Sequence, residues 1–412
     1  MNPRSSHLIG LDFVRGVAAL TVLVYHVDFM LGLRGSLLPG GYISVDLFFI
    51  LSGLVIARTY EDAFVSGRIS VLEFARRRLA RLYPLYLATT LVGIVVMAAR
   101  FRSNFGFIDT FPLVVSALAN VVGLPTPVAP YDDALKALFP FNAASWSISY
   151  ELLVNLIYCT VAFRLPTRWL VLIWFCLLGL MVIVARQFGG VDVGWDQANL
   201  AAGIARACFS FTSGVLIWRF LKHRKPSGSF ALLGVLLAAE LLSTQAQHWA
   251  PANLKPWTDL FLVVIFLPAI VIVAAGVDPR GAAGALSRFL GDVSYSVYLT
   301  QSPLIIAAAG LTQALLRAKI FDLAPLSGIL FVPVCVAVSY FVFRYIEMPA
   351  RRTLRSMRFP LGFKPSAGHG RQNARGLNRL AVADKTRCAG QSDSVHPIAF
   401  AKRLAPRYRG DP

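Results

Sequence analysis

Long apolar runs separated by short polar loops recur along most of the chain. They lie at about residues 8–31, 42–58, 82–99, 107–124, 147–163, 168–186, 203–221, 229–245, 258–276, 290–315 and 326–346. Runs of this length predict helices, because about 20 apolar residues are needed to cross the hydrocarbon core of a bilayer. The pattern therefore predicts an all-α fold, a polytopic integral membrane protein.

The basic loops indicate which of these runs cross the membrane. Clusters of arginine and lysine lie at residues 68–81, 164–168 and 219–225, and such clusters favour the cytoplasmic side. They all share one side with the basic C-terminal tail if run 107–124 only dips into the bilayer or lies flat. We therefore predict about ten transmembrane helices, cytoplasmic termini and a re-entrant or interfacial outer segment from about 100 to 146. An eleventh crossing is the alternative, because the charge rule is a bias.

Composition supports a membrane protein and locates the excess charge. The 412 residues are 56% hydrophobic and 15% charged, which excludes the soluble classes. Residues 350–412 hold 14 Lys and Arg against 3 Asp, so +11 of the net charge of +19 lies in the tail and gives no reason to expect nucleic acid. We predict a membrane domain at 1–352 and a basic, disordered cytoplasmic tail at 353–412.

The five cysteines show no CxxC spacing and no cluster with histidine, so neither disulfides nor a metal site is expected.

The first apolar run carries charge where a membrane span rarely does. Arg15 and His26 are eleven residues apart, which is three helical turns plus roughly 20°, so they share one helix face at a separation of about 16 Å. In the purely structural interpretation, Arg15 extends toward the nearer membrane interface and His26 is a hydrogen-bonded packing residue at the far one. We favour a functional stripe, because two polar groups on one face should point into the protein or a wet cavity.

Further polar residues stand at the edges of other runs. Asp46 lies among phenylalanines in the second run and needs a partner, for which Arg15 and His26 are the candidates. An arginine face precedes the third run and suits a polyphosphorylated ligand, although it could serve only as a topology signal; it consists of Arg77, Arg78 and Arg81. Later groups are Trp146, Ser147, Ser149 and Glu151, then Asp292, Ser294, Tyr295, Tyr298 and Gln301, then Glu347 between Arg344 and Arg351.

Six segments taken in order resemble the acyltransferase-3 family of integral membrane acyltransferases. They are LDFVRGVAALTVLVYH, GYISVDLFFILSGLVI, RRRLARLYPLY, SWSISYE, LGDVSYSVYL and YIEMPARR, and they extend from about residue 8 to 352. The most specific element is an arginine and a histidine separated by ten residues, here Arg15 and His26. The resemblance implies a ten-helix core in a bacterial inner membrane. It also implies transfer of an acyl group, expected to be acetyl, from cytoplasmic acyl-CoA to a hydroxyl of a surface or exported glycan.

The same resemblance implies roles for individual residues. His26 would be the catalytic imidazole, acting as general base or through an acyl-histidine, and Arg15 would support acyl-CoA or its tunnel. The arginine face would hold the CoA phosphates. Trp146, Ser147 and Glu151 would line the acceptor side, with Asp46, Tyr295 and Glu347 in supporting positions. Gln301 stands where the family often has histidine, which bears on any role needing a second base and leaves the His26 mechanism untouched.

A transporter or flippase is the rival hypothesis from another class. Buried Arg, His, Asp and Glu would also suit a proton-coupled path for a glycan or small polar substrate. The sequence lacks the two similar halves with paired broken helices that such proteins often show. A silent scaffold is disfavoured by the amount of charge within the membrane.

Overall fold

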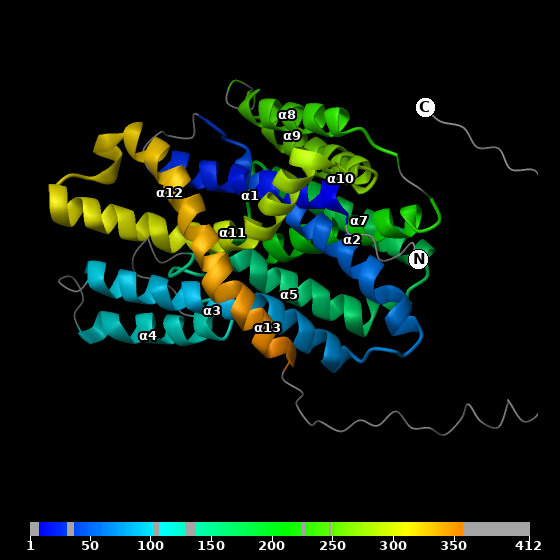
Figure 1. Ribbon diagram of the computed structural model, residues 1–412, viewed down its shortest axis with the longest axis horizontal. Helices are drawn as coiled ribbons and strands as arrows, with labels where there is room; N and C mark the ends of the chain where they lie inside the picture. Colours follow the sequence, from blue (N-terminus) through cyan, green and yellow to red (C-terminus); the bar gives the residue numbers. More distant parts are fainter. Residues whose placement is uncertain are drawn as a thin grey trace, which may run out of the picture. The chain divides into compact units, whose positions relative to one another are not determined.

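The computed structural model describes residues 8–30, 37–101, 107–127, 137–224, 227–246, 249 and 251–356. Regular structure within these residues is helical, without a β-strand (Figure 1). Segments long and apolar enough to span a membrane are Ile9–Asp28, Gly41–Val65, Val71–Ala99, Thr167–Phe188, Gln197–Leu221, Lys255–Ala275, Gly281–Leu316 and Leu326–Leu354. The predicted fold class, an all-α polytopic membrane protein, is confirmed. The basic tail and its predicted disorder lie outside the described residues.

The helices follow the apolar runs, with the boundaries extended where charged residues continue a helix. They are α1 (Ile9–Met30), α2 (Ser44–Val65), α3 (Val71–Phe101), α4 (Phe107–Val121), α5 (Ser145–Thr160), α6 (Thr167–Phe188), α7 (Leu200–Leu221), α8 (Phe230–Ala246), α9 (Lys255–Phe261), α10 (Leu267–Ala275), α11 (Gly281–Leu316), α12 (Leu326–Val342) and α13 (Met348–Ser356). Single π-helical turns, Leu262–Phe266 and Phe343–Glu347, join α9 to α10 and α12 to α13. Short 3-10 turns are Gly41–Ile43, Ala162–Arg164, Gln197–Asn199 and Ile320–Leu323.

Two helix pairs form the centre of the bundle, α1 with α11 and α2 with α7. Glycine permits the close approach in the second pair, because a Cβ atom on Gly53 would meet the Phe211 carbonyl and one on Gly214 would meet the Ile50 carbonyl. Small residues at helix contacts are typical of membrane proteins, where packing replaces the hydrophobic drive. The pairing holds α1, which carries both Arg15 and His26, against α11.

The segment between α3 and α5 enters the bundle without a long helix. The 15-residue α4 ends beside the middle of α3, where the Tyr83 hydroxyl donates to the Val121 carbonyl at 3.0 Å. The chain before α5 is also buried between helices, and Asn142 donates to Thr89 at 3.0 Å and to the Leu299 carbonyl at 3.1 Å. Irregular backbone at such depth is tolerated when protein surrounds it. The arrangement agrees with the predicted re-entrant segment, although residues 102–106 and 128–136 lie outside the described part.

Candidate functional site

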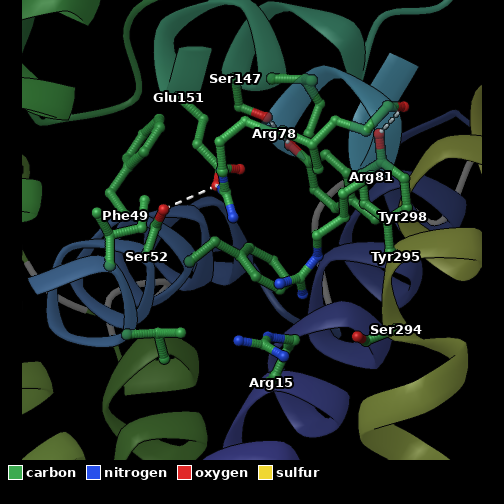
Figure 2. Close-up of a pocket in the computed structure, with 15 residues that line it drawn as sticks. Arg15, Phe49, Ser52, Arg78, Arg81, Ser147, Glu151, Ser294, Tyr295 and Tyr298 are labelled. Atoms are coloured by element: carbon green, nitrogen blue, oxygen red, sulfur yellow. Dashed lines mark hydrogen bonds and ion pairs between the residues drawn. The ribbon is translucent and has the colours of Figure 1, made fainter. Parts of the chain in front are cut away.

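A small cavity of about 70 Å³ lies where α1, α2, α3, α5 and α11 meet. Figure 2 shows Arg15 approaching it from α1 while Arg78 and Arg81 enter from α3. The other polar side chains around it are Ser52, Ser147, Glu151, Ser294, Tyr295 and Tyr298. We call this space the arginine cavity. It brings together Arg15, two of the three predicted arginines, and three of the predicted acceptor-side or supporting residues, namely Ser147, Glu151 and Tyr295.

Positive charge exceeds negative charge in the arginine cavity. Glu151 is the only carboxylate among the lining residues; it forms an ion pair with Arg78 and accepts the Ser52 hydroxyl at 2.7 Å. The buried Arg78 Nε has no hydrogen-bond partner within the part of the chain that the structure describes. Among the described residues, Asp12 pairs with Arg15 at a distance of 3.8 Å. Three guanidiniums around one carboxylate in a partly buried space favour an anionic ligand.

A wider hollow of about 470 Å³ continues from the arginine cavity, and Arg78 and Arg81 line both spaces. We call it the arginine mouth. Its other charged residues are Glu73, Arg76 and Arg77. Arg77 therefore lies in the mouth and not in the cavity, and its Nε pairs with Glu73 at 2.7 Å. The predicted arginine face is thus divided between two connected spaces.

His26 is half-buried and does not line the arginine cavity. Its Nδ1 lies 3.3 Å from Oε1 of Gln301 on α11, and the Gln301 amide nitrogen donates to the Tyr298 carbonyl at 3.0 Å. The hydroxyl of Tyr298 bonds with Ser147 at 2.7 Å, and both of these residues line the cavity. Gln301 and Tyr298, one turn apart on α11, therefore form a series of contacts from the imidazole to the arginine cavity.

Asp46 pairs with neither of its predicted partners, so that expectation was wrong. Its carboxylate binds Arg206 of α7, with Asp46 Oδ2 at 2.7 Å from Nη2 and 2.9 Å from Nε, and Ser210 donates to Oδ1 at 2.7 Å. Both charged side chains are fully buried. The physical reason is the contact between α2 and α7, which puts Arg206 opposite Asp46 while Arg15 faces α3. A lone arginine within run 203–221 was the signal that could have identified this partner.

Three other predicted residues make packing contacts, hydrogen bonds or ion pairs with neighbouring parts of the protein. Trp146 is buried edge-on against Phe49 and Tyr150, and it does not line the arginine cavity. The hydroxyl of Tyr295 donates to the Leu82 carbonyl at 2.7 Å. Glu347 is buried at the π-helical turn, where it accepts from Ser296 and pairs with Arg351.

A second polar cluster that sequence reasoning missed adjoins His26. The ring of Tyr25 lies 5.4 Å from that of His26, and its hydroxyl donates to Asp192 at 3.1 Å. Burial raises the pKa of the Asp192 carboxyl, which lies in the loop after α6. Close by, Tyr42 donates to Asp259 and accepts from Lys255 at 2.7 Å. A charged residue inside run 258–276 was the available signal for Asp259.

No group of three or more metal-ligating side chains occurs among the residues for which the structure gives positions. The chemistry of the cavity is instead that of guanidinium, hydroxyl and imidazole groups. These groups can bind anions, orient a ligand and accept a proton.

Comparison with known proteins assigns the chain to a family. A family model described as an acyltransferase domain matches residues 8–344. Acyltransferase MdmB of Streptomyces mycarofaciens is 31% identical over 334 residues, covering 73% of this chain and 79% of that protein. Protein 2 in the picA locus of Rhizobium radiobacter is 32% identical over 187 residues, 43% of this chain and 94% of that protein.

A longer relative is the O-acetyltransferase OatA of Staphylococcus aureus, which is 24% identical over 374 residues. The match covers 84% of this chain and 57% of OatA. No solved structure matches the chain. Because the family model covers most of the sequence, and because MdmB is matched over most of both chains, this protein belongs to the acyltransferase-3 family of integral membrane acyltransferases.

Proposed function

We propose that this enzyme moves an acyl group, expected to be acetyl, from cytoplasmic acyl-CoA to a hydroxyl of a cell-surface or exported glycan. The observation that carries the proposal is the arginine cavity, where Arg15, Arg78 and Arg81 face a single carboxylate. An anionic donor fits this charge, and a guanidinium fork matches phosphate oxygens. The name of the relative OatA, an O-acetyltransferase, supports a hydroxyl acceptor.

The two connected spaces suit the two parts of acyl-CoA. The arginine mouth is the wider and more exposed space, so we assign the CoA phosphates to it and to Arg78 and Arg81 at its inner end. The uncharged thioester arm would then extend past Arg15 and Ser147 toward α11. This division gives Arg77 a secondary role, since its guanidinium already pairs with Glu73.

His26 would supply the base for transfer. An alcohol is a poor nucleophile at neutral pH, and imidazole titrates in the range that general-base catalysis needs. The acceptor oxygen attacks the thioester carbonyl carbon, its proton passes to the imidazole, and the carbon–sulfur bond breaks. The proton on the imidazole then returns to the departing thiolate, so the products are the ester and free CoA. A transient acyl-histidine is the alternative course.

A transfer assay tests the proposal against transport. Purified protein in sealed vesicles is given radiolabelled acetyl-CoA outside and a glycan isolated from the host's cell surface inside, with each orientation tested. We expect an alkali-labile acetyl ester on the glycan, absent in vesicles without protein. Chemical analysis of surface glycans from cells with and without the gene should show the same difference. Movement of glycan across the vesicle with no ester in any preparation would support the flippase hypothesis instead.

A further inference from the structure

The side chain of Gln301 is completely buried on α11 and has both ends engaged. Its Oε1 lies 3.3 Å from His26 Nδ1, and its Nε2 donates to the Tyr298 carbonyl at 3.0 Å. This residue touches the only histidine in a predicted span. It also stands where the resemblance to the family would place histidine. Its contacts therefore bear on how His26 is held in this particular chain.

The Tyr298 carbonyl fixes which way the Gln301 amide points. A carbonyl oxygen can only accept, so the amide NH₂ must face Tyr298 and the amide oxygen must face His26. Turning the amide over would place its oxygen against the Tyr298 carbonyl oxygen, so that two acceptors face each other at a buried position. Because the oxygen that faces the imidazole also only accepts, the hydrogen bond requires a proton on His26 Nδ1.

We propose that Gln301 is a positioning residue that holds neutral His26 with its proton on Nδ1 and leaves Nε2 as the basic nitrogen. The inference rests on the proposed role of His26 as the base, and it adds which ring nitrogen acts. In a neutral histidine, the hydrogen bond made by one ring nitrogen decides which nitrogen carries the proton, and the other nitrogen is then free to act as the base. An uncharged amide does this without placing a second titrating group beside the imidazole.

The other polar groups around His26 engage partners of their own. Asp28 of α1 accepts the backbone amides of Leu37 and Leu38, at 2.8 and 3.3 Å. Asp192, in the loop after α6, accepts the Tyr25 hydroxyl, and Asp46 of α2 is paired with Arg206 of α7. Within α1, the backbone of Val22, one turn before His26, also hydrogen-bonds the imidazole. Among the described residues, Gln301 is the side chain from another helix that contacts Nδ1.

The tautomer can be measured directly because His26 is one of only six histidines. The other five are replaced by asparagine, namely His7, His223, His248, His369 and His396. The protein is labelled with ¹⁵N-histidine in detergent or nanodiscs at a pH where the ring is neutral. NMR correlation then shows whether the proton is bonded to Nδ1 or Nε2. We expect it on Nδ1 in the parent protein.

Three variants separate positioning from general structure. Gln301→Met removes the acceptor at nearly constant volume, and we expect a mixture of tautomers with kcat lowered about tenfold, the effect of one ordinary hydrogen bond, and KM for acetyl-CoA little changed. Gln301→Glu, when its carboxyl is protonated, has the same donor and acceptor pattern and should restore the Nδ1 proton. Gln313→Met changes an exposed glutamine on the same helix and should alter neither quantity.

A proton on Nε2 in the parent protein would overturn the inference, and so would an unchanged tautomer in folded Gln301→Met. Neither result depends on activity. Normal transfer by a folded His26→Ala protein would instead refute the catalytic role of His26 while leaving the NMR assignment intact. Failure of the positioning role and failure of the proposed function are thus distinguishable.

Discussion

Two buried arginines illustrate how the chain uses the same residue in different ways. Arg206 gives its hydrogen bonds to Asp46, to the Val193 carbonyl at 3.1 Å and to the Tyr42 carbonyl at 2.7 Å. Arg78 pairs with Glu151, but its buried Nε, beside a cavity, has no partner among the described residues. A guanidinium with its donors occupied by protein has a structural role, whereas one with a spare donor next to open space can bind a ligand.

Breaking the Arg206–Asp46 pair should destabilise the fold. Asp46→Asn leaves the Arg206 charge buried without its carboxylate, and losing one partner of a buried pair typically costs about 3–5 kcal/mol. We expect a clearly lower thermal midpoint in detergent, followed by tryptophan fluorescence. Arg168→Ala changes an exposed residue in the first turn of α6. It is the control and should leave the midpoint unchanged. Equal stability of Asp46→Asn and the parent would contradict a structural role for the pair.

Replacing His26 should remove catalysis and spare binding. We expect folded His26→Ala to retain acyl-CoA binding and to lose transfer by roughly two to four orders of magnitude, the usual range for a general base. His223→Ala, an exposed histidine after α7, serves as the matched control. Trapping labelled acyl on the parent protein but not on His26→Ala would favour the acyl-histidine course. Near-normal transfer by His26→Ala would end the catalytic assignment.

At the residue scale, the sequence could identify chemistry but not partners. The sequence indicated several polar groups in or beside apolar runs as candidate site residues. The structure places four of them around one cavity, namely Arg15, Arg78, Glu151 and Tyr295. The contact between His26 and Gln301 spans 275 positions of the chain and depends on how α1 packs against α11. Hydropathy and spacing within one helix carry no information about such a contact.

At the element scale, α3 differs most from its predicted span. The apolar run begins near residue 82, but the helix starts at Val71 and continues through Pro84. The arginines before the run are therefore part of the same helix and reach into the bundle. The sequence placed them ahead of the span because the apolar run begins after them and because basic clusters favour the cytoplasmic side. The carboxylate partner of Arg78 is Glu151 on α5, and this distant contact is what makes the burial of Arg78 tolerable.

The division of the arginine face leads to a graded prediction for ligand affinity. Arg78 and Arg81 line both the arginine cavity and the arginine mouth, whereas Arg76 and Arg77 line only the mouth and pair with Glu73. We expect the double alanine variant at 78 and 81 to weaken acetyl-CoA binding more than the double variant at 76 and 77. Lysine at 78 and 81 should restore binding only in part, since a point charge lacks the guanidinium fork.

Calorimetry on detergent-purified protein measures these affinities, and thermal melting checks that each variant is folded. Because Arg78→Ala leaves Glu151 without its partner, the comparison should include Arg81→Ala alone, whose side chain has no paired carboxylate among the described contacts. Unchanged acetyl-CoA affinity in folded Arg81→Ala and in the folded double variants would leave only the topology-signal interpretation of the arginine face.

Over the whole molecule, basic and acidic groups gather at opposite ends of α1. The arginine mouth and cavity adjoin Arg15. Four aspartates lie toward the His26 end, namely Asp28, Asp46, Asp192 and Asp259, against two cations there, with Arg206 bound to Asp46 and Lys255 bound to Asp259. A field of this kind attracts an anionic donor to one end and disfavours it at the other. It therefore fits a donor and an acceptor that approach from opposite sides of the membrane.

The orientation of this polarity in the membrane is the last prediction. Loop charge predicts that the arginine mouth faces the cytoplasm, but two residues predicted to lie outside, Arg34 and Lys136, are beyond the described residues. The exposed ends of α6 offer better probes. Arg168 is near its start and Gln187 near its end, and a helix of 22 residues is long enough to separate them across the bilayer.

Single cysteines are introduced at 168 and 187 in a protein from which the five native cysteines have been removed, after its transfer activity has been checked. A membrane-impermeant maleimide is applied to intact cells and to opened membranes. We expect position 187 to react in intact cells and position 168 only after opening, because positively charged loops are retained on the cytoplasmic side. The reverse pattern would invert the topology. The arginine mouth would then face away from cytoplasmic acyl-CoA, and the assigned direction of transfer would have to be abandoned even if the chemistry at His26 stood.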